Sequence, residues 1–342
     1  MKKNLIILLC LIGTLALVMA APAPAQAGKI DDLYEAAKKE GQVVWQSIRP
    51  PENFKELVNS FQKRFPGIKL TVIRVSGTKV PQRLIAEAQA NRVSIDVGST
   101  AIGPGMPLID RDLLVSQDYT GTGVNPKDLV LDGKMLFARD TVIGVVYNTK
   151  LVAKKDVPRK WEDLINPKWR SKIAVIKAGA GFAGVASIWD DAKLVWFLKE
   201  LTKLNVQIAP GSINSLNRVS SGELAFTTCT TLDETAKRKA MGAPVDVAPL
   251  SPIYAAQVNL FMIKGVPHPN AAKLFMIWMG SPEGRKALAK AEWGPVNPCG
   301  PTLLDKMLCG KNLDIYRLNT IARSKEYART KTLVVKTLGL VR

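Results

Sequence analysis

Three short groups of hydroxyl and glycine residues in this chain of 342 residues have the side-chain types that bind anions. Ser76-Gly77 and Ser99-Thr100 each follow a predicted strand, and Gly179-Ala180-Gly181 precedes a predicted helix. Backbone N–H groups at such turns, together with the helix dipole, favour a bound anion. Arg49 and Arg139 could add bidentate hydrogen bonds to a carboxylate, phosphate or phosphonate. These residues together predict a binding site for a small anionic solute.

Each of these residues also has an ordinary structural explanation. Ser, Thr and Gly are common at turns and helix N-caps in any α/β protein. The prediction therefore depends on the group and not on any one member, because a doubly wound sheet brings the carboxyl ends of its strands to one crevice.

The sequence contains no pattern typical of catalysis or of a metal centre. The only histidine, His268, lies between two prolines in a predicted turn, so neither a Ser-His-Asp set nor a cluster of metal ligands can be built around it. Zinc-binding and phosphate-loop motifs do not occur. We therefore expect a binding protein that is not an enzyme and that uses no metal and no cofactor.

Strands and helices alternate along the first third of the chain. Strands are predicted at residues 42–46, 68–75 and 93–97, with helices beginning at Pro51 and at Val80 between them. This β-α-β-α-β order implies parallel strands covered by helices. Right-handed crossovers then give a doubly wound sheet.

A second α/β region begins at Trp161, after a predicted strand at 142–147. It includes a strand at 173–176, a long helix at 182–201 and a strand at 224–228, and a further strand at 256–263 returns to the first region. We therefore expect an α/β fold of two lobes, each a doubly wound mixed sheet, joined by hinge strands around a ligand cleft. The predicted division is 1–27 signal peptide, 28–140 first part of lobe 1, 141–250 lobe 2, 251–298 return to lobe 1 and 299–342 C-terminal segment.

The N-terminal residues predict export to the periplasm. Lys2 and Lys3 precede an apolar run at 5–19, and Ala25-Gln26-Ala27 has the small-residue pattern of a cleavage site. We predict a signal peptide cleaved after Ala27.

The chain is strongly basic, with a formal net charge of +19 from 48 Lys and Arg against 29 Asp and Glu. Such a charge attracts anions. The basic residues are spread over nearly every segment and no nucleic-acid-binding motif is present, so we expect no nucleic-acid partner. A solvated basic surface and selection for an anionic ligand both remain explanations of the charge.

Three cysteines follow the predicted signal peptide. Cys299 and Cys309 bracket a short stretch and could form a disulfide in an oxidising compartment. Cys229 is either a small apolar core residue or a thiolate ligand for a soft metal.

Several short motifs occur in an order typical of a known protein family. They are LYEAAKKEG at 33–41, FPGIK at 65–69, VYNTK at 146–150, WEDL at 161–164, GAPVD at 242–246, PHPNAAKLF at 267–275 and SPEG at 281–284. The chain resembles family 1 extracellular solute-binding proteins, in the branch that includes the periplasmic ferric-ion-binding proteins. This resemblance implies two lobes that close on a ligand and deliver it to the permease and ATPase subunits of an ABC importer, with the receptor acting as a monomer.

The positions that hold iron in that branch carry other residues here. The resemblance places Arg49 at the position of the first-strand ligand, Ser99-Thr100-Ala101 at that of a carboxylate, and Thr230 and Thr231 at that of a tyrosine pair. An arginine repels a metal cation, and hydroxyls replace the phenolates that Fe(III) favours. The resemblance therefore implies a receptor for a small anion with ligand contacts from Thr230 and Thr231.

Three alternatives remain at this point. The first is a receptor for ferric iron or a chelated metal, as in the branch itself. The second is a periplasmic enzyme, and the third is a sensory receptor that feeds a signalling protein.

Overall fold

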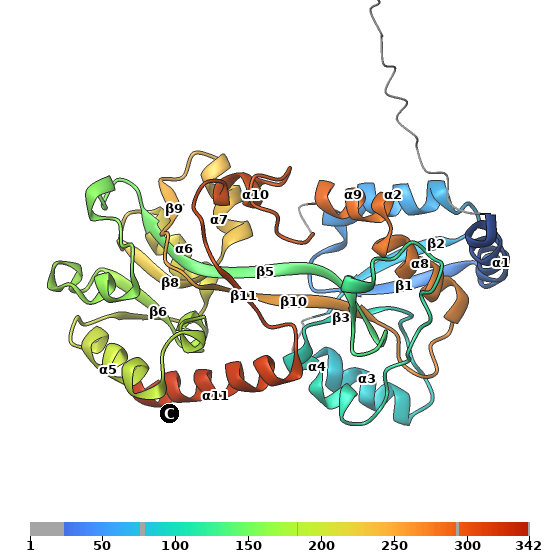
Figure 1. The fold of residues 1–342 in the computed structure, drawn as a ribbon, viewed down its shortest axis with the longest axis horizontal. Helices are drawn as coiled ribbons and strands as arrows, with labels where there is room; N and C mark the ends of the chain where they lie inside the picture. Colours follow the sequence, from blue (N-terminus) through green and yellow to red (C-terminus); the bar gives the residue numbers. More distant parts are fainter. Residues whose placement is uncertain (1–23, 76–78, 183, 292–293, 341–342) are drawn as a thin grey trace, which may run out of the picture.

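The computed structural model describes residues 24–75, 79–182, 184–291 and 294–340, with side chains from residue 29 onward. Two α/β lobes lie side by side and are connected by two long strands, β5 (Met135–Asn148) and β10 (Ile253–Phe261) (Figure 1). The predicted two-lobed α/β fold with mixed sheets is confirmed. Most of the predicted signal peptide and the site residues Ser76 and Gly77 lie outside the described residues. In the described part of the chain, no helix combines the length and apolar composition that a membrane span requires.

Lobe 1 is built on the parallel pair β1 (Gln42–Ser47) and β2 (Lys69–Arg74). A single bridge from Trp45 to Val97 leads to β3 (Gly98–Thr100), which pairs with β10, and β4 (Leu129–Val130) adds a short strand beside β5. The helices of this lobe are α1 (Pro24–Glu40), α2 (Lys55–Arg64), α3 (Val80–Gln89), α4 (Ile102–Ile109), α8 (Pro269–Gly280) and α9 (Pro282–Lys290).

The strand predicted at residues 93–97 is not formed, and this prediction was wrong. Asp96 accounts for part of the difference, because its carboxylate replaces a backbone acceptor for Val44, while backbone hydrogen bonds from Asp96 and Val97 to Val44 keep the segment beside β1. The Asp96 carboxylate accepts hydrogen bonds from the backbone N–H groups of Val44 at 2.7 Å and His268 at 2.8 Å. The short strand β3 follows instead, and it runs antiparallel to β10.

The core of lobe 1 surrounds the indole of Trp45, which is fully buried. Its ring centroid lies 4.7 Å from that of Phe54 and 5.6 Å from that of Phe275. The indole Nε1–H donates to Ser99 Oγ at 2.7 Å, so the one polar atom of this ring is satisfied inside the core.

The strands β5 and β10 are antiparallel neighbours along most of their length. Their register pairs Val142 with Ala255 and Met135 with Phe261, with an irregularity between Val258 and Asn259. Because each strand belongs to both lobes, the lobes share one continuous sheet of nine strands. The predicted lobe boundary at residue 140 falls inside β5, and the boundary at residue 250 falls just before β10; the division itself stays a prediction.

Lobe 2 continues this sheet away from the connection. β8 (Phe226–Thr231) lies antiparallel to β5 and parallel to β6 (Ile173–Ile176), while β7 (Gln207–Ala209) pairs with β6 and β9 (Val245–Val247) pairs with β5. The helices of lobe 2 are α5 (Asp191–Thr202), α6 (Ser212–Ser220) and α7 (Leu232–Ala240). Short 3-10 helices complete the chain: η1 (Pro51–Phe54), η2 (Pro126–Asp128), η3 (Lys154–Asp156), η4 (Trp161–Ile165), η5 (Pro167–Trp169), η6 (Ala180–Phe182) and η7 (Val185–Ser187).

The single long helix predicted at residues 182–201 was wrong. The segment forms η6, η7 and then α5, which begins only at Asp191. The Asp190 carboxylate accepts a hydrogen bond from the backbone N–H of Lys193 at 2.8 Å, and this N-cap fixes the start of α5.

The C-terminal segment ties the two lobes together on one side of the sheet. β11 (Ile315–Arg317) pairs in parallel with β10, and α11 (Ile321–Thr337) then runs from α4 in lobe 1 to α5 in lobe 2 (Figure 1). Figure 1 shows α11 along the opposite side of the sheet from α7 and α10 (Leu303–Leu308).

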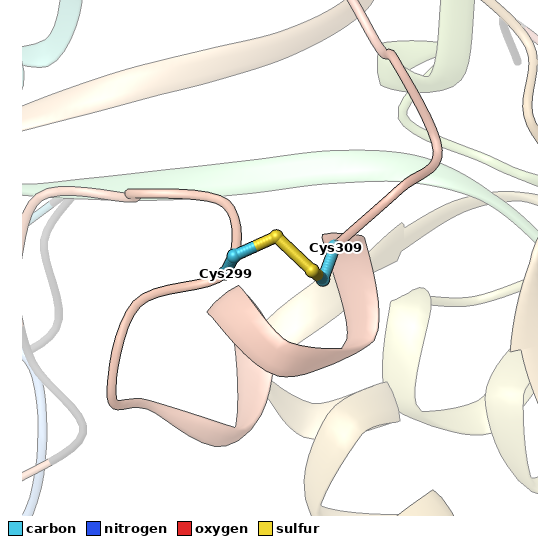
Figure 2. Close-up of a disulfide and its surroundings, with 2 residues drawn as sticks. All are labelled: Cys299 and Cys309. Atoms are coloured by element: carbon cyan, nitrogen blue, oxygen red, sulfur yellow. A yellow bond between two sulfur atoms is a disulfide. The ribbon is translucent and has the colours of Figure 1, made fainter.

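Cys299 and Cys309 are joined by a disulfide that closes the loop around α10 (Figure 2). Thr302 and Asp305 form a capping box at the start of α10, and Asp305 also accepts a hydrogen bond from the backbone N–H of Asn297 at 2.7 Å. The loop is therefore held by a covalent bond and by a nearly fully buried carboxylate.

Replacement of both Cys299 and Cys309 by serine should lower the free energy of unfolding by about 2–3 kcal/mol, because the unfolded chain regains the entropy of an open loop. Urea denaturation followed by circular dichroism measures this change. Reduction of the unaltered protein should give the same loss. An unchanged denaturation midpoint in both experiments would contradict the prediction.

Candidate functional site

A cavity of about 420 Å³ opens between the lobes, on the side of the sheet that carries α2 and α7. Residues from both lobes and from the connecting strand β5 form its wall. They are Ile48, Arg49, Pro50, Asn53 and Arg74 from lobe 1, Arg139 and Thr141 from β5, and Ile213, Thr231, Asp233, Glu234 and Lys237 from lobe 2. Four of these side chains are basic and two are acidic.

Arg49 reaches across this cavity from the end of β1. Its backbone N–H donates to Ser47 Oγ at 3.1 Å, which fixes the turn that follows the strand. Its guanidinium forms an ion pair with Asp233, in the first turn of α7 on the other lobe. Both side chains are mostly buried, with 15% and 14% of their surfaces exposed, so the pair is shielded from bulk solvent.

Arg139 lies on β5 at the floor of the cavity. Its side chain is 4% exposed, its Nη2 lies 3.5 Å from Asp233 Oδ2, and its Nε donates to the backbone carbonyl of Asp140 at 3.1 Å. Burial, followed by the charge of Arg49, lowers the pKa of Arg139 well below its usual value, while Asp140 opposes this shift. A guanidinium removed from water in this way gains more from a bound anion than an exposed one does.

Asp140 fixes the strand behind the cavity. Its Oδ2 accepts from the backbone N–H of Val296 at 3.1 Å and lies 3.4 Å from Arg317 Nη2 on β11. Burial raises the pKa of the Asp140 carboxyl, and Arg317 is the largest of the influences that oppose the rise. Asp140 therefore connects β5 to the C-terminal segment, with its own ion-pair partner outside the cavity wall.

Two polar atoms at the cavity wall accept or donate no hydrogen bond within the described residues. They are Thr141 Oγ1 and Asp233 Oδ1, both shielded from solvent. Buried groups of this kind are uncommon in native proteins, and a hydrogen-bonding partner from a bound solute or water would satisfy them. The wall thus combines guanidinium groups, a hydroxyl and a carboxylate oxygen around one small space.

Of the predicted site residues, Arg49, Arg139 and Thr231 line the cavity. Thr230 lies beside it in β8, fully buried and paired in register with Gly144. Thr231 is the N-cap residue of α7, so the first turn of that helix begins at the cavity wall.

Ser99 and Thr100 lie away from the cavity, and the structure corrects their predicted position. Both are buried in β3 inside lobe 1. Ser99 accepts from the indole of Trp45, and its backbone N–H donates to Gln46 Oε1 at 2.9 Å. The physical reason is the missing strand at 93–97, because without it these residues do not end a parallel strand at the crevice.

The glycine turn at 179–181 is likewise not part of the cavity wall. A Cβ atom on Gly179 would lie 2.8 Å from Val335 Cγ2 of α11, and one on Gly181 would lie 2.5 Å from the carbonyl oxygen of Thr228. Gly179 also has a φ of +65°, which favours glycine. Ala180 opens η6 and packs in the apolar cluster that contains Cys229. Close packing against α11 at Gly179 and against β8 at Gly181 explains the glycines, and their assignment to an anion site stays a prediction.

Sequence reasoning missed Asn53, Arg74, Asp233, Glu234 and Lys237. One signal was available, since the helix that follows Thr231 has two acidic residues in its first turn. Arg74 ends β2, and a similar argument from strand ends would have included it.

His268 and Cys229 have structural roles. His268 Nδ1 lies 3.0 Å from Asp96 Oδ2, within lobe 1. Cys229 is 2% exposed, and burial raises the pKa of its thiol to about 12. Within the residues described, no group of three or more His, Cys, Asp or Glu side chains could hold a metal ion.

The fold and the interlobe cavity place the molecule among two-lobed binding proteins. Residues 56–302 match the family of bacterial extracellular solute-binding proteins, and the chain belongs to this family.

A curated relative, the Fe(3+)-binding periplasmic protein of Serratia marcescens, is 27% identical over 199 residues, which span 56% of this chain and 57% of that protein. A Trichodesmium protein solved with iron and citrate ligands has a TM-score of 0.69 at 17% identity, over 87% of this chain and 99% of the other. The protein AfuA from Actinobacillus pleuropneumoniae, solved with fructose-6-phosphate, has a TM-score of 0.63 at 19% identity, over 88% and 99%. At these identities the two solved structures establish the fold alone.

Substitution of Ser99 by alanine should lower the free energy of unfolding by about 1–3 kcal/mol, because the buried indole N–H of Trp45 loses its acceptor. Urea denaturation tests this, and calorimetric titration should show unchanged ligand affinity. Weaker ligand binding without a loss of stability would contradict this prediction and would favour a ligand-binding role for Ser99.

Cys229 should resist thiol reagents in the folded protein. With a thiol pKa of about 12, only about one molecule in ten thousand carries the reactive thiolate at a pH of about 8. Labelling with a chromogenic disulfide should therefore be negligible before urea is added and should reach one thiol per chain afterwards. Rapid labelling of the folded protein would contradict this result.

Proposed function

We propose that this protein is a periplasmic receptor of an ABC-type importer and binds a small anionic solute in the cleft between its lobes. The observation that carries the proposal is the pair of shielded guanidinium groups, Arg49 from lobe 1 and Arg139 from the connecting strand, at the wall of one cavity. Planar guanidinium groups match carboxylate, phosphate and phosphonate oxygens in bidentate geometry.

The family and the shape of the molecule support this proposal. Members of the family are extracellular solute-binding proteins, and AfuA, a protein of the same fold, was solved with a phosphorylated sugar. Closure of the lobes would bring Asn53 and Arg74 toward Thr231 and Lys237 around a bound solute. The same proposal includes the permease and ATPase subunits of an importer as partners and the cleavage of a signal peptide after Ala27. It also includes action as a monomer and the absence of enzymatic activity.

A second candidate is a receptor for a chelated metal. The Serratia relative is named for Fe(3+), and the Trichodesmium structure holds iron together with citrate. The cavity wall offers guanidinium groups and no phenol or imidazole, so it suits the carboxylates of a chelator better than the bare metal ion. An anionic ferric chelate therefore fits this chemistry, whereas free ferric iron does not.

Replacement of Arg49 by alanine should weaken binding of the natural solute by at least about tenfold, since one of the two guanidinium groups is lost. Calorimetric titration measures the affinity. Arg49→Lys should recover only part of it, because an ammonium group lacks the bidentate fork. Arg64→Ala removes an exposed arginine in lobe 1 and should bind like the unaltered protein. Unchanged affinity in Arg49→Ala would contradict the proposed site.

Native mass spectrometry of the protein purified without refolding identifies the solute. We expect an additional mass from a phosphorylated, phosphonated or carboxylated small molecule. A bare iron adduct with a charge-transfer absorption band would favour the metal receptor instead. Titration with ferric chloride and with ferric citrate separates the bare ion from the chelate.

A further inference from the structure

Asp233 occupies a central position between the two arginines of the cleft. Its Oδ2 forms the ion pair with Arg49 and lies 3.5 Å from Arg139 Nη2. The other acidic residue of the wall, Glu234, lies 3.2 Å from Arg238 one turn further along α7. Among the described residues of the cavity wall, Asp233 is therefore an acidic residue that contacts both guanidinium groups proposed to hold the solute.

An incoming anion must consequently share these two arginines with Asp233 or displace it. Asp233 is held in place by α7, so its effective concentration at Arg49 is that of a tethered group, about millimolar or higher. A monocarboxylate that takes its place replaces one negative charge with another of the same kind and loses its freedom of translation and rotation. Little net affinity is left for such a ligand.

A dianion is in a different position. A phosphate monoester carries a charge of about −1.5 to −2 near neutral pH and three acceptor oxygens, so it can engage both arginines more strongly than one carboxylate does. Arg74 and Lys237 also line the cavity and add positive charge around the same space. The free energy of binding therefore favours ligands that carry two negative charges on one small group.

Resting on the proposed function, we infer that Asp233 is a specificity-determining residue that competes with bound anions for Arg49 and Arg139, so that the cleft selects phosphate monoesters and phosphonates over monocarboxylates. The opposite role is that of a positioning residue, in which Asp233 holds the two guanidinium groups at the correct angle for the solute. The two roles predict changes of opposite sign when the carboxylate is removed.

Substitution of Asp233 by asparagine tests the inference, with methyl phosphate and acetate as probes of similar size at a pH of about 8, where the first is a dianion and the second a monoanion. Calorimetric titration of the unaltered protein should show methyl phosphate bound at least about tenfold more tightly than acetate. In Asp233→Asn, the affinities for both probes should rise. The affinity for acetate should rise by about tenfold or more and that for methyl phosphate by less, so the ratio of the two affinities should fall.

Asp233→Ser removes the carboxylate with a smaller side chain and should change the affinities in the same direction. Both variants leave two shielded guanidinium groups side by side, so their melting temperatures should rise more steeply with added phosphate ester than that of the unaltered protein. Glu223→Gln, which removes an exposed carboxylate of lobe 2 that pairs with Arg218, should behave like the unaltered protein.

Weaker binding of both probes in Asp233→Asn and Asp233→Ser would overturn the inference in favour of the positioning role. Unchanged affinities in both variants would also overturn it. In either case the proposed function stands if the unaltered protein binds methyl phosphate and Arg49→Ala binds it at least about tenfold more weakly. Failure of the folded, unaltered protein to bind either anion would overturn the proposed function together with the inference.

Discussion

The structure depends above all on the antiparallel pairing of β5 and β10, which run through both lobes as one ladder. Because these strands are continuous, any relative motion of the lobes would have to bend or twist the same two strands. Arg139 and Thr141 lie on β5 within this connection. The floor of the cavity is therefore formed by a strand that both lobes share, while its walls come from the separate lobes.

Opposite charges from the two lobes meet across the cleft. Arg49 on lobe 1 and Asp233 on lobe 2 form an ion pair that crosses the cavity, and Arg139 lies next to it on the floor. The attraction within a mostly buried ion pair is strengthened by the low dielectric around it, but both charged groups have lost much of their hydration. A solute that contacts both Arg49 and Asp233 would therefore interact with both lobes at once.

The C-terminal segment determines which side of the sheet is accessible. α11 spans from α4 to α5, and its side chains Val334 and Val335 pack on Gly179. Arg317 on β11, which is part of the same segment, lies 3.4 Å from the buried Asp140, the neighbour of Arg139. One side of the connection is thus closed by packing, and residues of α7 line the cavity. Figure 1 shows α7 on the side of the sheet opposite to α11.

The sequence by itself determined the class of fold, because the alternation of apolar strands and amphipathic helices is a local property that repeats along the chain. It also indicated Arg49 and Arg139, since arginines after or within strands have a chemistry that can be named without coordinates, whereas Thr231 was indicated by the resemblance to the solute-binding family. Tertiary structure decided the rest. Asp233 contacts Arg49 across 184 positions of the chain, and Ser99 accepts a hydrogen bond in the core from the indole of Trp45, 54 positions away. Which polar residues face the cleft is a matter of long-range packing, and no local pattern of residue types contains that information.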